Sequence, residues 1–176
     1  MNSPEIEDES NPSNRPLILA LIGAVATAAL FCGLWLTSRS TNPGDIDRML
    51  TEEAPEARAT AVEVIELLIN LDAGNVDEAG ERVLELSTGN FREDYEELLP
   101  GLGPAFEEAG ASASGEILEG PDVAFTALDE AEAVAQVAQT TTVDGGERSV
   151  GYTLRLTLVK DDENWRADAF ELVGEL

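Results

Sequence analysis

The sequence has no histidine and one cysteine, Cys32, in 176 residues. Without histidine there is no Ser-His-Asp triad, no Cys-His pair and no imidazole metal site. A single cysteine excludes an intramolecular disulfide framework and a cysteine zinc cluster. Basic residues are scarce, 10 against 36 acidic ones for a formal net charge of −26. We therefore expect no nucleic-acid partner, because phosphate binding needs clustered lysine and arginine.

Hydrophobic residues are distributed unevenly along the chain. Residues 1–16 are polar, acidic and interrupted by proline, which predicts a disordered tail. Residues 17–36 then contain no charged side chain, and a helix of 20 residues covers about 30 Å, the hydrocarbon thickness of a bilayer. We predict an uncleaved transmembrane helix here, since the run exceeds a signal-peptide core and no small-x-small cleavage site follows it.

Small residues recur on one face of this predicted span, at Ala20, Ala24 and Ala28. Such spacing lets two helices approach closely in lipid. Alanine is also common in any span, so two interpretations stay open: contact with another membrane helix, or composition alone. Arg15 and Arg39 lie on opposite flanks, so the distribution of positive charge does not decide the orientation.

The remainder divides into a linker over residues 37–50 and one domain over residues 51–176. In this domain, apolar residues at helical spacing predict a first helix that begins at Thr51 and ends near Gly74. A second helix is predicted over residues 76–86. A third is predicted from Phe91, interrupted at Pro100 and Gly101, because proline disfavours a helix interior.

After Gly110 the hydrophobic period changes to that of strands. We expect short strands over residues 113–118 and 123–128 around a turn at 119–122, then strands over 133–143, 150–160 and 165–173. One face of the fourth strand is predicted to line an interior cavity or to fill the core: Val150, Tyr152, Leu154, Leu156 and Leu158. Helices followed by hairpin-joined strands predict an α+β fold, about three helices packed on a bent antiparallel sheet of four to five strands.

Few side chains are candidates for chemistry. Tyr152 could donate a hydrogen bond from an apolar face, and Asp168 is the nearest candidate base. Packing explains the tyrosine and solvation the aspartate more simply, so we predict no catalytic residue, no cofactor and no enzyme. Asp72, Asn75 and Asp77 do not match the calcium-loop pattern, so we predict no metal site.

Acidity dominates residues 37–176, which hold 32 acidic and 9 basic residues. The simpler interpretation is a solvated surface, or adaptation to high salt. The alternative is an acidic face that binds a basic partner or divalent cations.

The order of these features resembles the Mce-associated (mammalian cell entry) membrane proteins of actinobacteria. The resemblance covers residue 17 to the C-terminus and is carried by Leu71-Asp72, Asp77, the run TGNFREDY over residues 88–95, and Asn164-Trp165-Arg166. It implies a cone-like domain of the ketosteroid isomerase and nuclear transport factor two type outside the cytoplasmic membrane, with residues 1–16 in the cytoplasm. It also implies a non-catalytic accessory subunit of an Mce-type lipid or sterol import complex, in contact with Mce-domain subunits and the permease.

Other functions fit the same order of features. One alternative is a membrane-anchored assembly component of a type IV secretion or conjugation system. Another is a small lipid-binding module, with the lipid inside the cone. A homo-oligomer, formed through the sheet or the alanine face, is compatible with each.

Overall fold

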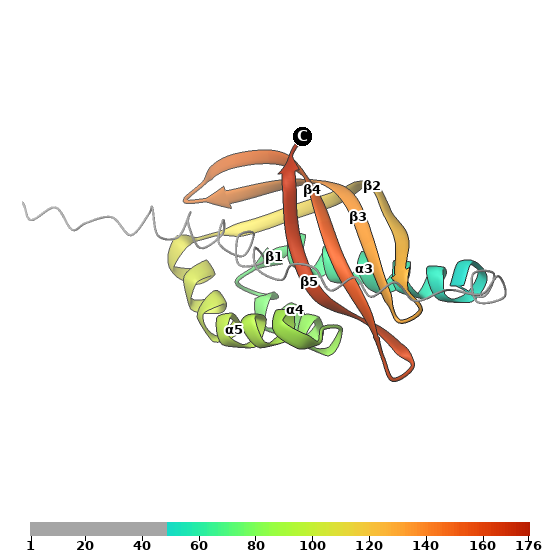
Figure 1. The fold of residues 1–176 in the computed structure, drawn as a ribbon. Helices are drawn as coiled ribbons and strands as arrows, with labels where there is room; N and C mark the ends of the chain where they lie inside the picture. Colours follow the sequence, from blue (N-terminus) through green and yellow to red (C-terminus); the bar gives the residue numbers. More distant parts are fainter. Residues whose placement is uncertain (1–48) are drawn as a thin grey trace, which may run out of the picture.

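The structure, a computed structural model, describes residues 49–176, with side chains from Thr51 onward. The predicted tail, the predicted span with Ala20, Ala24 and Ala28, and most of the predicted linker lie outside the described residues. Within the described part, no helix is long and apolar enough to cross a membrane. Three α-helices come first and the long strands follow, which confirms the predicted α+β order (Figure 1).

The chain enters the domain through a five-residue π-helix, η1 (Met49–Glu53), which continues as α3 (Ala54–Ile69). Pro55 lies in the first turn of α3, where its missing N–H costs nothing. Four apolar residues of the predicted helical pattern are buried in α3, namely Ala57, Ala61, Val64 and Ile65, and Ile69 is buried as well. The helix ends earlier than predicted, because the chain turns after Ile69 to form the two-residue strand β1 (Leu71–Asp72) at the sheet edge.

The second and third helices are α4 (Val76–Glu85) and α5 (Gly89–Ala109). The predicted interruption of the third helix is wrong, since α5 runs through both Pro100 and Pro104. Both prolines are exposed, so water can solvate the carbonyl groups that they leave unpaired. Leu102 and Phe106 are buried in the same turns and hold the helix in place. It ends at Gly110, whose φ of 51° is the left-handed conformation of a helix C-cap.

Four long strands complete the fold: β2 (Ser112–Ala127), β3 (Glu130–Val143), β4 (Gly146–Asp161) and β5 (Asn164–Glu175). With β1 they form one antiparallel sheet in the order β1-β2-β3-β4-β5, which confirms the predicted bent sheet of four to five strands. The two short strands predicted on either side of residues 119–122 are in fact one strand, β2. Both halves of β2 pair with the continuous strand β3, and the register of this pairing shifts between Ile117 and Asp122. The predicted turn is thus a bulge that bends β2.

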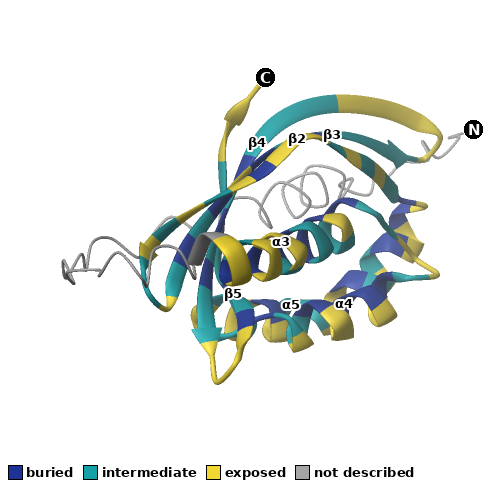
Figure 2. Cartoon of the chain, turned by 90° about the vertical axis from the view of Figure 1, so that its right-hand side faces the viewer, coloured by how far each residue is buried: buried dark blue, intermediate teal, exposed yellow. Residues whose placement is uncertain are grey.

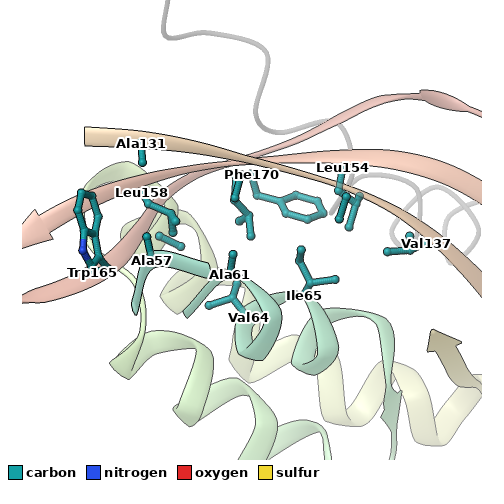
Figure 3. Packing of buried hydrophobic residues seen from close by; sticks show 14 of the residues in the cluster. Ala57, Ala61, Val64, Ile65, Ala131, Val137, Leu154, Leu158, Trp165 and Phe170 are labelled. Atoms are coloured by element: carbon teal, nitrogen blue, oxygen red, sulfur yellow. The ribbon is translucent and has the colours of Figure 1, made fainter. Parts of the chain in front are cut away.

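The sheet curls around α3, and α4 and α5 cover the other side of that helix (Figure 2). The main core lies between α3 and the concave face of the sheet. Here small residues face large ones, with alanines on β3 and on α3 opposite leucines on β4 (Figure 3). A second cluster lies between α4 and α5 and contains Val76, Val83, Tyr95, Leu102 and Phe106.

Candidate functional site

The predicted apolar face of β4 lies in the main core of the domain. Leu154, Leu156 and Leu158, from the predicted apolar face of β4, are fully buried in the main core. Ala57 and Ala61 of α3 belong to the same core, and their small side chains let the helix approach the sheet closely (Figure 3). Val150, at the start of the same face, is half-buried. The three leucines therefore belong to the hydrophobic cluster between the sheet and α3.

Tyr152 is half-buried and holds a structural hydrogen bond. Its hydroxyl donates to Oε1 of Gln139 at 2.7 Å. The amide of Gln139 in turn donates to the backbone oxygen of Ile69 at 3.0 Å. Burial raises the pKa of Tyr152 to about 12, so the phenol stays protonated at neutral pH. This chain of hydrogen bonds ties β4, β3 and the end of α3 together.

Asp168, the candidate base, is distant from Tyr152. Tyr152 lies opposite Glu175 in the β4–β5 register, whereas Asp168 occupies the bulge beside Ala167, the partner of Leu158. At about 3.3 Å per residue, the two positions are roughly 15–20 Å apart along the strands. Burial raises the pKa of Asp168, but this carboxyl group and the phenol form no acid–base pair.

The acidic turn before α4 uses its own side chains to hold its backbone. Oδ1 of Asp72 accepts hydrogen bonds from the backbone N–H groups of Gly74, at 2.7 Å, and Asn75, at 3.0 Å. The side chain of Asn75 accepts one from the N–H of Asp72 at 2.8 Å. Nowhere in residues 49–176 do three or more metal-ligating side chains gather.

A buried ion pair joins the entry segment to the β4–β5 hairpin. Nζ of Lys160 lies 2.5 Å from Oε2 of Glu53, and the indole N–H of Trp165 donates to the same oxygen at 3.1 Å. The Glu53 side chain is 7% exposed and that of Lys160 is 23% exposed. The ammonium also lies 5.9 Å from the centre of the Trp165 ring, within the range of a cation–π contact. This cluster fixes the residues through which the predicted linker enters the domain.

The sequence does not predict this junction of Glu53 with Lys160 and Trp165. The residues are 107 and 112 positions apart, so no local pattern connects them. The available signal was composition: Lys160 is the only lysine among 10 basic residues, and Trp165 is one of two tryptophans. Glu53 lies at the start of the first predicted helix with no sequence feature that predicts burial, yet it is almost fully buried.

The run TGNFREDY joins α5 to β5. The backbone N–H of Thr88 donates to the carbonyl of Ala167 at 2.8 Å. The ring of Phe91 stacks on that of Phe170 with 6.3 Å between the ring centres, and its centre lies 5.9 Å from that of the Tyr95 ring. The guanidinium of Arg92 donates a hydrogen bond to the backbone oxygen of Leu84. The residues that carry the Mce resemblance therefore make contacts that hold the fold.

The two sides of the domain differ in surface character. The exposed sides of α4 and α5 carry many carboxylates: Asp77, Glu78, Glu81, Glu85, Glu93, Asp94, Glu96, Glu97, Glu107 and Glu108. The two arginines on these helices are already engaged, Arg82 with Glu63 and Glu85, and Arg92 with the Leu84 carbonyl. In contrast, the long strands expose single large apolar side chains: Leu118 of β2, Val134 of β3 and Val173 of β5.

Comparison with solved structures supports the cone-like fold. The chain is similar to an IcmL-like type IV secretion system protein from Legionella pneumophila, with a TM-score of 0.58, 10% identity, and coverage of 69% of this chain and 92% of that one. It is also similar to the VirB8 protein of Agrobacterium tumefaciens, with a TM-score of 0.54, 16% identity, and coverage of 72% and 94%. CagV of Helicobacter pylori, a VirB8 homologue, gives a TM-score of 0.53 at 7% identity, over 69% and 98% of the two chains.

No protein-family model matches the sequence, and no characterised protein matches it at the sequence level. The Mce resemblance therefore stays a prediction. The fold neighbours correspond to the alternative that the sequence left open, a component of a type IV secretion or conjugation system.

Proposed function

We propose that the protein is a non-catalytic, membrane-anchored assembly subunit of an envelope complex of the type IV secretion or conjugation kind. The similarity to three secretion-system proteins, each covered over more than nine-tenths of its own chain, is the observation that carries this proposal. Residues 17–36 would supply the anchor, with the domain outside the cytoplasmic membrane.

Purification of the tagged full-length protein from its own membranes in mild detergent tests the proposal, with co-purifying proteins identified by mass spectrometry. We expect secretion or conjugation subunits to be enriched. A matched control, Leu156→Asp, places a charge in the main core and unfolds the domain while it keeps residues 1–48. Partners that bind the folded domain should be lost from this control.

Other results would replace the proposal. Recovery of Mce-domain subunits or their permease would establish the accessory role in lipid import that the sequence resemblance implies. Recovery of no protein, together with a bound lipid in the purified sample, would favour a lipid-binding module.

A further inference from the structure

The helices α4 and α5, which together we call the α4–α5 layer, have a hydrophobic cluster of their own on the side of α3 that faces away from the sheet (Figure 2). Within residues 51–176, this second cluster has seven buried residues, whereas the main core between α3 and the sheet has fifteen. Segments with few buried apolar contacts open locally more often than the rest of a fold. We therefore expect the α4–α5 layer to be the less stable of the two parts.

The second cluster also buries a polar group without a partner. Tyr95 is 3% exposed, and its hydroxyl oxygen has no hydrogen-bond partner in the described part of the chain. The other tyrosine, Tyr152, donates a hydrogen bond to Gln139. A buried hydroxyl group that makes no hydrogen bond lowers the stability of the folded state. Because opening of the layer lets the Tyr95 hydroxyl reach water, this group favours opening.

The second half of α5 depends on packing to stay helical. Residues 100–104 read Pro-Gly-Leu-Gly-Pro, and proline and glycine have the lowest helix propensities of all residues. Leu102 is the buried residue of this stretch, and Phe106 is the next one along the helix. This part of α5 is therefore helical only while these two side chains stay in the second cluster. We expect the loss of packing and the loss of helix to occur together.

The two helices pack closely against each other along the layer. A Cβ atom at Gly80 of α4 would collide with the methyl carbons of Leu99 of α5, so the absence of a side chain permits this contact. Further along, a Cβ atom at Gly103 of α5 would lie 3.6 Å from Cγ1 of Val76 of α4, which is ordinary van der Waals contact. Departure of one helix alone would expose the apolar side chains of both, so we expect α4 and α5 to open as one unit.

Carboxylates crowd the exposed side of this layer. On α5, Glu93 lies three residues before Glu96 and four before Glu97, and on α4, Asp77 lies four residues before Glu81. Residues at these spacings are neighbours on a helix surface, with about 5–6 Å between Cβ atoms, and like charges there destabilise the helix. All five residues are exposed, so dissolved ions can screen their charges.

The cations of the domain do not neutralise these groups. Within residues 51–176, none of the five carboxylates takes part in an ion pair. The two arginines of these helices, Arg82 and Arg92, are engaged with other groups. The screening length is about 30 Å at 10 mM salt and about 3 Å at 1 M. Repulsion within the layer is therefore strong in dilute salt and largely screened in concentrated salt.

We propose that the α4–α5 layer opens as a unit while α3 and the sheet stay folded, and that ionic strength controls how often it opens. Opening uncovers the apolar side chains of α3 that pack against the second cluster, Leu67 and Leu68. The layer thus acts as a lid over this side of α3, closed in concentrated salt and open more often in dilute salt. The inference goes beyond the proposed assembly function and does not depend on it.

Hydrogen exchange of the full-length protein in a non-ionic detergent, in about 10 mM and about 1 M NaCl, tests this opening. Each exchange rate is divided by that of the unfolded chain at the same salt concentration, so that only structural protection is compared. We expect the rates in residues 76–109 to be about tenfold or more higher in dilute salt, because the carboxylates are then unscreened. The rates in β3 and β4, which contribute to the main core, should change by less than about twofold.

A pair of charge-neutralised variants tests whether the repulsion lies within the layer. One variant replaces three carboxylates of α5, Glu93→Gln, Glu96→Gln and Glu97→Gln, and should reduce the salt-dependent change in the layer by about threefold or more. Glutamine and glutamate have similar helix propensities, so the effect reports on charge. The matched control removes three exposed carboxylates of the sheet, Glu116→Gln, Glu119→Gln and Glu147→Gln, and should leave the change in the layer unaltered. Unchanged protection of β3 and β4 confirms that each variant is folded.

Three results would overturn the proposal. Equal salt dependence in the layer and in β3 and β4 would mean that the domain opens only as a whole. Exchange in the layer that does not change with salt would mean that repulsion between its carboxylates has no part in opening. An equal effect of the sheet variant and the α5 variant would mean that the net charge of the chain matters and its position in the layer does not.

Discussion

The ion pair between Lys160 and Glu53 predicts a strong energetic link between the entry segment and the β4–β5 hairpin. The substitution Lys160→Met leaves a carboxylate that is 7% exposed with the Trp165 indole but without its cation. Removal of one partner from a fully buried pair costs about 3–5 kcal/mol. Because the Lys160 side chain is 23% exposed, water can reach Glu53, and we expect a loss of about 2–3 kcal/mol in the free energy of unfolding.

Urea unfolding of the full-length protein in detergent measures this loss. The chain has two tryptophans, so a Trp35→Phe background makes the fluorescence report on Trp165 beside the ion pair. Glu53→Gln should cost less, about 1–2 kcal/mol, because the ammonium that it leaves can turn toward water. The double variant should cost less than the sum of the two, by about 1–2 kcal/mol, since the residues contact each other.

Arg82→Met is the matched control, because Arg82 also contacts two groups, Glu63 and Glu85, but does so on the surface. We expect little change in stability from it. If Lys160→Met has no greater effect than Arg82→Met, or if the two junction substitutions are additive, the argument from burial is wrong. Hydrogen exchange adds a local test: exchange should accelerate in residues 49–54 of the Lys160→Met protein while the middle of α3 stays protected.

Glycine and tyrosine positions give two further predictions. Gly89→Ala should cost about 1–2 kcal/mol, because Gly89 has a φ of 55° and a Cβ there would lie 2.0 Å from Oδ1 of Asp168. Gly101→Ala, in the same helix with open space around it, should instead stabilise the protein by about 0.5–1 kcal/mol, and equal unfolding midpoints for the two variants would contradict this. Burial raises the pKa of both tyrosines, Tyr95 and Tyr152, to about 12, so phenolate absorbance of the folded protein should appear near that pH. Because unfolded tyrosine ionises near pH 10, stability should fall as the pH rises from about 10 toward 12, and phenolate absorbance near pH 10 in the folded protein would show that the rings are accessible.

Elements with a clear hydrophobic period were predictable from sequence. The buried positions of α3 follow helical spacing, and the alternation of β4 places Leu154, Leu156 and Leu158 on one face, where the structure buries all three. In both elements one face packs against the rest of the domain, so the spacing of apolar residues in the sequence predicts which positions are buried.

Two of the prediction errors involve proline, and tertiary contacts explain them. Pro100 predicts a break in the third helix, but Leu102 and Phe106 bury the turns that follow it, and the helix continues. Gly120-Pro121 predicts a turn between two strands, but β3 pairs with the chain on both sides of it. A proline inside a helix costs about 3 kcal/mol of stability, and the burial of several apolar side chains outweighs that cost. The contact of Glu53 with Lys160 has no local signal at all.

The residues of the domain differ between its interior and its surface. In the interior, leucines of β4 lie in one cluster with the alanine-bearing face of α3. Of the surfaces that remain, α4 and α5 are acidic along their exposed sides, which gives solubility but little to discriminate between partners. The junction at Glu53 holds the start of the domain against the β4–β5 hairpin, so the point where the chain enters the domain is fixed relative to the sheet.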